Sequence, residues 1–219
     1  MVKAGARSMD TSEYTTKPVA VVLAAGLSRR MGTPKATLPW RDTTLLGHVV
    51  RMTRDELGWA TVVVVGNASQ VPHDVIGVVN RMPEAGIASS LYLGLEAVLQ
   101  RGKGESAAIF LADQPFVSAE DAKRTWQLLR QHPDAIAVRP RYNGSIGHPV
   151  LLRLERVWDT ISRLTGDIGL GKWLTERQDV LTFDVSVVDR PSPAWDLDTP
   201  SEYLEAINLK WQGDDDDDP

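Results

Sequence analysis

Cysteine is absent from all 219 residues of the chain. This absence excludes disulfides, thiolate nucleophiles and every cysteine-ligated zinc or iron–sulfur site, so any metal must be held by oxygen or imidazole. No serine lies in a GxSxG elbow, which disfavours a serine hydrolase. Zinc chemistry is disfavoured as well, because no metal-ligand spacing connects the histidines, which are His48, His73, His132 and His148.

Long apolar runs are also missing. No stretch approaches the ~18 residues needed to cross a bilayer, and residues 1–16 lack the apolar segment of a signal peptide. The net charge of −5 is matched by the five aspartates of residues 214–218, so the rest of the chain is neutral overall. We therefore expect a cytoplasmic protein that binds neither nucleic acid nor membrane.

The size and composition are those of one globular domain with a sizeable core, since 42% of the residues are hydrophobic and 24% are charged. Residues 1–16 are polar and aperiodic, and residues 213–219 are an acidic run. We expect a disordered leader and a disordered tail on either side of a folded domain at residues 17–212.

Apolar runs rich in β-branched residues alternate with stretches of helical periodicity. The runs cover residues 18–26, 60–66, 75–80, 106–113, 134–140 and 180–186. The helical stretches cover residues 44–57, 89–100, 118–131, 154–164 and 168–176. Continuous apolar strands are typical of a sheet buried on both faces, so the pattern predicts an α/β fold whose mostly parallel sheet has helices on both faces.

Two helices have start signals in the sequence. Ser118 with Asp121 resembles a capping box, and Thr199 is followed by Pro200 and Glu202 at the first and third helical positions. In a sheet of this kind, ligands collect beyond the carboxyl ends of the strands. The loops to inspect are therefore those after Ala25, Val65, Asn80, Ala112 and Val138.

The loop in VAVVLAAGLSRRMGTPK, residues 19–35, matches none of the common phosphate signatures. It lacks GxGxxG, and no GK[ST] follows its glycines. Gly26 nevertheless ends a buried strand and allows backbone N–H groups to face a ligand, with Arg29, Arg30 and Lys35 close by. These residues alone leave two interpretations open, a phosphate-binding loop or a tight turn with solvated basic side chains.

Two acidic segments also allow both a ligand-binding and a purely structural interpretation. Asp113 comes directly after a buried strand, where a carboxylate can bind Mg²⁺ or only cap local amides. Asp196 and Asp198 alternate, so on extended chain only one of them can face the site. Asp198 precedes a helix and is a second candidate Mg²⁺ ligand, or else it stabilises that helix N-terminus.

Two further stretches combine small residues with polar groups. Around Gly86 and Ala88, small residues would let a base or sugar lie against the backbone, and Ser89 or Ser90 can cap the following helix while facing the ligand. His148 follows Gly147 and leads into a strand. A single histidine of this kind is more often structural than catalytic.

Taken together, these motifs resemble a known family. LAAGLSRRMGTPK is similar to the LAAGxSxRMGxxK signature of nucleotidyltransferases related to molybdenum cofactor cytidylyltransferase, and LADQP, GHPVLL, TGDIG and DLDTP follow in that family's order. The resemblance spans residues 19–206. It implies a three-layer, Rossmann-like fold of the nucleotide-diphospho-sugar transferase type. It also implies Mg²⁺-dependent attack of an acceptor phosphate on a nucleoside triphosphate, with release of pyrophosphate.

The resemblance also implies roles for individual residues. Lys35, Arg29 and Asp113 are expected to be catalytic, and Asp113 and Asp198 are expected to hold Mg²⁺. The nucleotide is expected to contact Leu23, Ala24, Ala25, Gly26, Arg30, Ala88, Ser89 and Ser90. The acceptor side is expected to include Gly147, His148, Gly166 and Asp167.

Two details bear on the substrates. LAAG, with Ala25, is more similar to the cytidylyl branch of the family than to the guanylyl branch, which usually has LAGG, so CTP is favoured over GTP. The family's GDxGAR motif reads GDIGLGKW here, so an arginine able to meet an acceptor phosphate is replaced near Gly171 and Lys172.

The implied acceptor is a molybdopterin that carries molybdenum, and the product would pass to a molybdoenzyme or its chaperone. Two alternatives remain open. One is a guanylyl- or other nucleotidyltransferase with a different phosphorylated acceptor, and the other is a carrier that binds nucleotide or cofactor without turnover.

Overall fold

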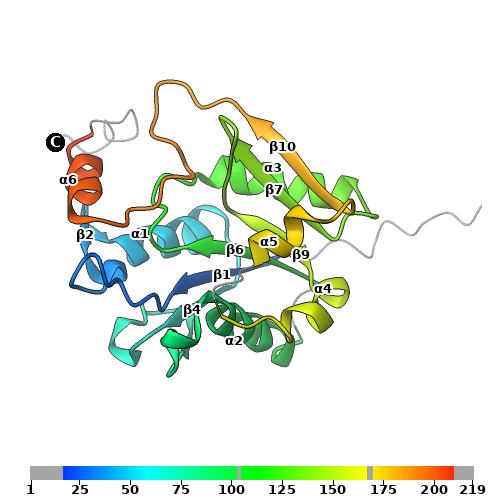
Figure 1. The fold of residues 1–219 in the computed structure, drawn as a ribbon, viewed down its shortest axis with the longest axis horizontal. Helices are drawn as coiled ribbons and strands as arrows, with labels where there is room; N and C mark the ends of the chain where they lie inside the picture. The colour runs from blue at the N-terminus through cyan, green and yellow to red at the C-terminus, as the bar shows by residue number, and fades with distance from the viewer. Residues whose placement is uncertain (1–16, 103–104, 167–169, 210–219) are drawn as a thin grey trace, which may run out of the picture.

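An eight-stranded sheet forms the centre of the molecule (Figure 1). The computed structural model describes residues 17–102, 105–166 and 170–209, and the predicted leader and acidic tail lie outside these residues. The sheet order is β10-β7-β9-β6-β1-β4-β5, with β8 paired to β7 outside this path, and β2 pairs with β3 separately. The strands are β1 (Val19–Ala24), β2 (Pro39–Trp40), β3 (Thr43–Thr44), β4 (Thr61–Val65), β5 (Ile76–Val79), β6 (Ser106–Leu111), β7 (Ala137–Tyr142), β8 (Ser145–Ile146), β9 (Val150–Arg153) and β10 (Val180–Val185).

Most neighbouring strands in this sheet are parallel, which confirms the predicted fold class. β1 pairs in parallel with both β4 and β6, while β9 is antiparallel to both of its neighbours, β6 and β7. The chain moves from β1 to β4 on one side and later returns to β6 on the other side. The strand order therefore reverses at β1, and in such sheets the crevice for a ligand lies at the carboxyl ends of the strands at that point.

All the predicted helices are present, most of them shorter than predicted, within the described residues. They are α1 (Leu45–Arg51), which a π-helical turn (Met52–Glu56) continues, α2 (Ile87–Gln100), α3 (Ala119–Gln131), α4 (Leu154–Ile161), α5 (Leu170–Thr175) and α6 (Pro200–Asn208). The capping box of Thr199 and Glu202 is confirmed. At α3, the Ser118 hydroxyl accepts a hydrogen bond from the Asp121 N–H at 3.1 Å.

The start of α2 differs from the prediction. We expected Ser89 or Ser90 to cap this helix, but the residue before its first turn is Gly86, whose φ of 88° favours glycine. The helix begins at Ile87, and the Ser89 hydroxyl donates to the Gly86 carbonyl at 2.8 Å instead of capping. The reason is local, because the positive φ of Gly86 turns the chain into the helix two residues before the first serine.

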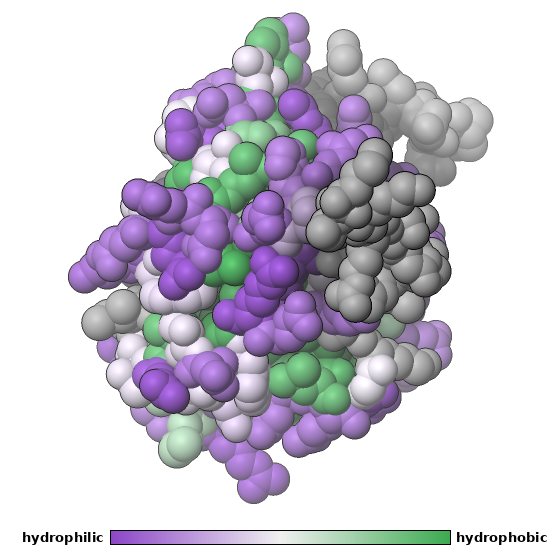
Figure 2. Space-filling view, turned by 90° about the vertical axis from the view of Figure 1, so that its right-hand side faces the viewer, coloured by the Kyte–Doolittle hydropathy of each residue, from purple (hydrophilic) through white to green (hydrophobic). Residues whose placement is uncertain are grey.

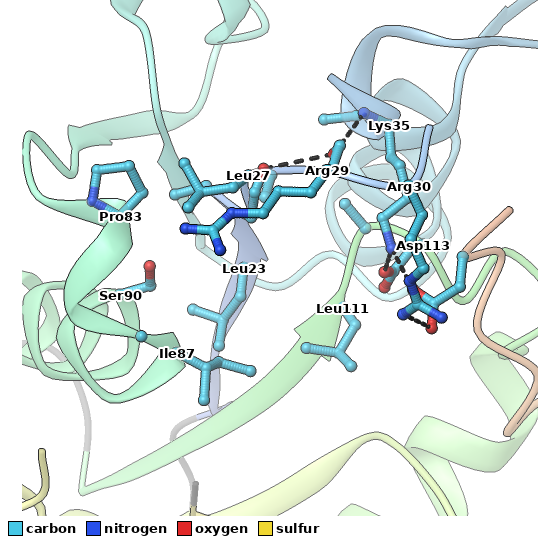
Figure 3. Close-up of a pocket in the computed structure, with 18 of the residues that line it drawn as sticks. Leu23, Leu27, Arg29, Arg30, Lys35, Pro83, Ile87, Ser90, Leu111 and Asp113 are labelled. Carbon is cyan, nitrogen blue, oxygen red and sulfur yellow. Dashed lines mark hydrogen bonds and ion pairs between the residues drawn. The ribbon is translucent and has the colours of Figure 1, made fainter. Parts of the chain in front are cut away.

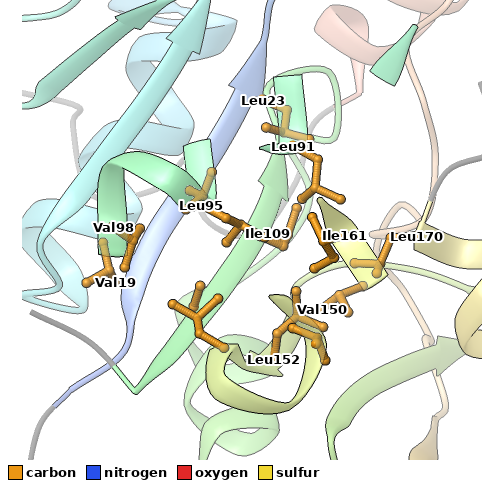
Figure 4. Close-up of a cluster of buried hydrophobic side chains, with 14 of the residues drawn as sticks. Val19, Leu23, Leu91, Leu95, Val98, Ile109, Val150, Leu152, Ile161 and Leu170 are labelled. Atoms are coloured by element: carbon orange, nitrogen blue, oxygen red, sulfur yellow. The ribbon is translucent and has the colours of Figure 1, made fainter. Parts of the chain in front are cut away.

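Helices cover both faces of the sheet, as predicted. Along β1, Val19, Val21 and Leu23 pack into a core with α2 and α4, while Ala20 and Val22 pack into a second core with α1 and α3. Figure 4 shows the first core, in which Leu91 and Leu95 of α2 lie near Ile109 of β6. The alternation of side chains along each strand therefore divides the apolar residues between two layers.

The edge strands depart from the expected burial on both faces. In β5, Ile76 and Val78 are only half-buried, and Gly77 and Val79 are exposed. β5 and β10 are the end strands of the sheet, so each has a neighbour on one side only. An apolar run therefore does not by itself distinguish a central strand from an edge strand.

A third, smaller core anchors the segment before α6. Trp40, Leu45 and Phe116 pack with Leu197 and with Ala206 of α6. Leu197 is fully buried, and its N–H donates to the Asp113 carbonyl at 3.0 Å. This packing holds Asp196 and Asp198, on either side of Leu197, next to the loop that follows β6.

The surface is mostly hydrophilic on the face that Figure 2 shows, as expected for a chain without long apolar segments. On this face, apolar residues gather in small groups. Within residues 17–102, 105–166 and 170–209, no helix has the length and apolar character that a bilayer crossing requires.

Candidate active site

The loop after β1 is folded around Ser28. The Ser28 hydroxyl accepts from the Lys35 N–H at 3.0 Å, and the Ser28 carbonyl accepts from the N–H groups of Met31 and Gly32 at 3.0 and 3.2 Å. Gly32 has a φ of 71°, in the region that favours glycine. Gly26 has no such constraint, and an added Cβ there would meet no atom within 4 Å. The backbone conformation therefore favours glycine at position 32, while position 26 leaves open space at the end of β1.

A cavity of about 430 Å³ opens at this loop. That volume lies within the ~300–1,000 Å³ typical of small-molecule sites. Its walls come from the end of β1 and the loop after it, the end of β6, the start of α2 and the segment before α6. The lining residues are Leu23, Ala24, Ala25, Gly26, Leu27, Ser28, Arg29, Arg30, Lys35, Ala36, Pro83, Glu84, Gly86, Ile87, Ser90, Leu111, Ala112, Asp113 and Asp198.

Opposite charges meet at one end of this cavity. The Lys35 ammonium forms ion pairs with Asp113 and with Asp198, the latter at 2.8 Å, and Arg30 donates to the other oxygen of Asp198 at 2.6 Å. Burial acts to lower the pKa of Lys35, but the two carboxylates outweigh it and raise that pKa. Burial acts to raise the pKa of Asp198, but Lys35 and Arg30 outweigh it and lower that pKa. Lys35 and Asp198 are thus held in their charged forms.

This end of the cavity can accommodate a divalent cation. Lys35 Nζ is itself a cation that bridges the two carboxylates. Among the described residues, no group of three or more metal-ligating side chains occurs. Mg²⁺ commonly takes one or two carboxylates and completes its coordination with substrate phosphates and water. Asp113 and Asp198 therefore suit a metal that arrives with a phosphate ligand, and not a metal held by protein alone.

The opposite wall of the cavity comes from the segment before α2 and from the start of that helix. Figure 3 shows the Arg29 side chain extending toward the wall that carries Pro83 and Ser90, whereas Lys35 and Arg30 lie with Asp113 on the other side. Ala88 and Ser89, which we expected at the nucleotide, do not line the cavity. Ala88 is buried, and the Ser89 hydroxyl points back to Gly86, because α2 begins at Ile87.

Gln114 joins the two remaining polar groups near the site. Its amide nitrogen donates to Asp196 Oδ1 at 2.8 Å, and its carbonyl oxygen lies 2.9 Å from His148 Nδ1. Because the carboxylate of Asp196 accepts from the amide NH₂, the amide oxygen faces His148, and we assign the imidazole proton to Nδ1. His148 is only half-buried, yet the protein around it lowers its pKa to about 4, mainly by burial and against the charge of Asp113. The ring is therefore neutral at pH 7.

The prediction that only one of the two alternating aspartates faces the site is confirmed, because Asp198 lines the cavity and Asp196 does not. Asp196 and Asp198 do take different partners, but both lie near Asp113. Burial raises the pKa of Asp196, the hydrogen bond from Gln114 lowers it, and the charges of Asp113 and Asp198 raise it further. Leu197, which lies between the two aspartates, is buried in the third core and holds the segment in place.

Gly147 and His148, predicted on the acceptor side, line a second cavity of about 170 Å³. This cavity shares Leu23, Ile87 and Leu111 with the first, so the two adjoin. Gly166, also expected on that side, lines neither cavity, and Asp167 lies outside the described residues.

Sequence patterns missed Ser28 and Gln114. Both lie inside motifs that were recognised, LSRRMG and LADQP. No spacing rule indicates that Ser28 folds the loop or that Gln114 connects Asp196 with His148, because each partner is set by the tertiary fold.

Comparison with known proteins gives a consistent picture. The family model described as the MobA-like NTP transferase domain matches residues 20–180. The molybdenum cofactor cytidylyltransferase of Escherichia coli (strain K12) is 24% identical over 193 residues, which cover 85% of this chain and 93% of that protein.

Solved structures extend the similarity to the fold. The crystal structure of Rv0371c from Mycobacterium tuberculosis H37Rv has a TM-score of 0.74 and 27% identity, covering 89% of this chain and 98% of that one. The structure of Rv0371c in complex with manganese, from the same organism, has a TM-score of 0.71 and 28% identity, covering 88% and 98% of the two chains.

Proposed function

The chain belongs to the family of MobA-like NTP transferase domains and is a nucleotidyltransferase, and we propose that its nucleotide is CTP. We further propose that the acceptor is a molybdopterin that carries molybdenum. In the proposed reaction, an oxygen of the acceptor phosphate attacks the α-phosphorus of CTP. The bond from that phosphorus to the β-phosphate oxygen breaks, and pyrophosphate leaves. The product is the cytosine dinucleotide form of the cofactor, made in the cytoplasm.

The observation that carries this proposal is the meeting of Lys35, Asp113 and Asp198 at one end of a nucleotide-sized cavity. Phosphoryl-type transfer demands little covalent chemistry from the protein. It depends on alignment of the reacting groups and on neutralisation of phosphate charge. A cluster of cations and carboxylates beside the end of β1 fits that requirement.

Individual residues can then be given roles. Lys35, Arg29 and Arg30 would contact the triphosphate, with Lys35 exchanging its carboxylate partners for phosphate oxygens. Backbone N–H groups near Gly26 would approach the phosphates through the open space at that position. Asp113 and Asp198 would hold Mg²⁺, which would supply positive charge to offset that of the triphosphate and of the leaving pyrophosphate.

The choice of CTP rests on two features. Ala25 lines the cavity beside Gly26, in the LAAG form of the loop. The curated relative of E. coli is a cytidylyltransferase. Both favour CTP over GTP.

The decisive experiment measures pyrophosphate release with each of the four common nucleoside triphosphates, Mg²⁺ and molybdopterin carrying molybdenum, with reactions that omit the acceptor or the metal as controls. We expect release with CTP only when acceptor and metal are both present. Release with GTP instead would support the guanylyl alternative. Tight nucleotide binding without release for any pair would indicate a carrier, and no nucleotide binding at all would overturn the proposal.

A further inference from the structure

Arg139 of β7 is a buried cation without a carboxylate partner in residues 17–102, 105–166 and 170–209. Only 5% of the residue is exposed. Its guanidinium donates to Thr182 Oγ1 at 3.3 Å, to the Gly171 carbonyl at 3.4 Å and to Thr175 Oγ1 at 3.2 Å. All three acceptors are neutral, and all three hydrogen bonds are long.

Such a charge is costly to bury. A buried ion normally needs a counter-ion or several good hydrogen bonds to offset its lost hydration. The other buried arginine, Arg153, donates to the carbonyls of Leu129 and Ala135 at 2.6 and 3.0 Å. Burial, followed by the like charge of Arg141, lowers the pKa of Arg139. Within the part of the chain that the structure describes, no carboxylate balances the positive charge of Arg139.

The second cavity gives this charge access to a ligand. Arg139 and His148 supply charged and polar side chains to its lining, and most of the remaining lining is apolar or glycine. Its volume of about 170 Å³ is smaller than a whole small-molecule site. Because it adjoins the first cavity through Leu23, Ile87 and Leu111, it suits one part of a larger ligand that also reaches the charged end.

We propose that this second cavity binds an oxyanion of the acceptor substrate, a phosphate or a carboxylate, with the guanidinium of Arg139 as its counter-ion. The inference rests on the proposed function, because it assigns the oxyanion to the acceptor. The cations that line the first cavity, Arg29, Arg30 and Lys35, serve the triphosphate, and Arg139 is not among them. A planar guanidinium presents parallel N–H donors that match the oxygens of a phosphate or carboxylate.

His148 offers a hydrogen-bond acceptor to the same cavity, whereas Arg139 offers donors. With its proton on Nδ1 directed to Gln114, the ring leaves Nε2 as a hydrogen-bond acceptor, and Nε2 has no partner among the described residues. An acceptor molecule that fits this cavity therefore combines an anionic group at Arg139 with an O–H or N–H group at His148.

The test compares Arg139→Met, which keeps the aliphatic length and removes the charge, with Arg141→Met as the matched control. Arg141 lies on the same strand, is more exposed and pairs with Asp184 at 3.5 Å. Each protein is saturated with CTP in the absence of metal and titrated by calorimetry with methyl phosphate in one arm and acetate in the other. We expect Arg139→Met to weaken binding of the preferred anion at least ~10-fold, the usual scale for a lost charged hydrogen bond, and Arg141→Met to leave it unchanged.

The two arms identify the chemistry of the ligand. Tighter Arg139-dependent binding of methyl phosphate assigns a phosphate, and tighter binding of acetate assigns a carboxylate. If neither anion binds, or if both variants bind as wild type does, the proposal is overturned. In turnover with the acceptor, Arg139→Met should raise the acceptor KM and leave the CTP KM unchanged, and an unchanged acceptor KM would also overturn it.

Folding and the proposed function are checked separately. Arg139→Met removes an unpaired buried charge, so its thermal midpoint should not fall below that of wild type. If Arg139→Met does not fold, the Arg139→Lys variant is tested in its place. An ammonium is a point charge that cannot donate two parallel hydrogen bonds, so Arg139→Lys should weaken anion binding at least ~3-fold. Wild-type anion affinity in Arg139→Lys would overturn the proposal. If the wild-type protein does not bind CTP, the proposed function is contradicted. If CTP binds but the anion affinity is the same with and without the Arg139 side chain, only this inference is contradicted.

Discussion

Lys35 Nζ lies 2.8 Å from Asp198 Oδ1, although 163 positions separate the two residues in the chain. The same ammonium forms an ion pair with Asp113. The loop after β1, the loop after β6 and the segment before α6 each contribute one of these side chains. Lys35 therefore pairs with both carboxylates that we propose as metal ligands.

Replacing Lys35 with methionine should change metal binding as well as nucleotide binding. Without the ammonium, Asp113 and Asp198 repel each other, and a divalent cation relieves that repulsion. We expect Lys35→Met to bind Mn²⁺ without nucleotide at least ~10-fold more tightly than wild type does, by calorimetry. The KM for CTP should rise, because a phosphate contact is lost.

Arg51→Met is the control for this prediction, since Arg51 pairs with the exposed Asp42 and does not line the cavity. It should leave both Mn²⁺ affinity and the KM for CTP unchanged. Unchanged Mn²⁺ affinity in Lys35→Met would contradict the idea that Lys35 competes with metal for the carboxylates.

Asp113→Ala should reduce turnover at least ~10²-fold, because charge stabilisation at the phosphates is lost. Folding should survive, since the side chain is partly exposed and the backbone bond from Leu197 to the Asp113 carbonyl remains. Steady-state pyrophosphate release and the thermal midpoint measure the two effects. Asp42→Ala removes an exposed carboxylate of an ion pair outside the cavity and should leave turnover intact. Wild-type turnover in Asp113→Ala would remove Asp113 from the metal role.

The two glycines of the loop after β1 should respond differently to alanine. Gly32 has a φ of 71°, so Gly32→Ala should lower the free energy of unfolding by ~1 kcal/mol in urea denaturation. Gly26 lacks such strain, and its added methyl meets no protein atom, so Gly26→Ala should keep wild-type stability. The methyl enters the space where we place phosphate, and we expect the KM for CTP to rise several-fold. A Gly26→Ala variant with normal CTP kinetics would argue for a simple turn.

His148 should make stability depend on pH in the mildly acidic range. In the folded protein, burial lowers the pKa of His148 from its usual 6.5 to about 4, so between these values the unfolded chain binds a proton that the folded protein does not. The free energy of unfolding therefore falls as the pH drops from 6.5 to 4, by up to ~3 kcal/mol from this one group.

His148→Gln should remove that part of the pH dependence, measured as the difference from wild type in urea denaturation at pH 4 to 7. The exposed His132, changed to glutamine, is the control for loss of an imidazole. Parallel pH profiles for wild type and His148→Gln would show that the histidine does not titrate as the structure indicates.

Local sequence predicted most of what depends on local physics. The apolar run of β1 and its alternating side chains, the capping box of Thr199, the place of Lys35 in the loop after β1 and that of Asp113 just after β6 could all be found by pattern. The start of α2 was missed by two residues, because the conformation of Gly86 decided it. The edge position of β5 was missed, because burial depends on the neighbouring strands and not on the run itself.

By itself, the sequence determined an α/β sheet, a glycine-containing loop with three cations, and carboxylates at strand ends. Only the tertiary structure decided which groups meet: Lys35 with Asp198, Gln114 with Asp196 and His148, and Arg139 with no carboxylate in the described part of the chain. The physical reason is that strand periodicity and helix caps act over a few residues. Ion pairs, desolvation and cavities depend instead on strand order and on packing between segments far apart in the chain, which no local pattern encodes.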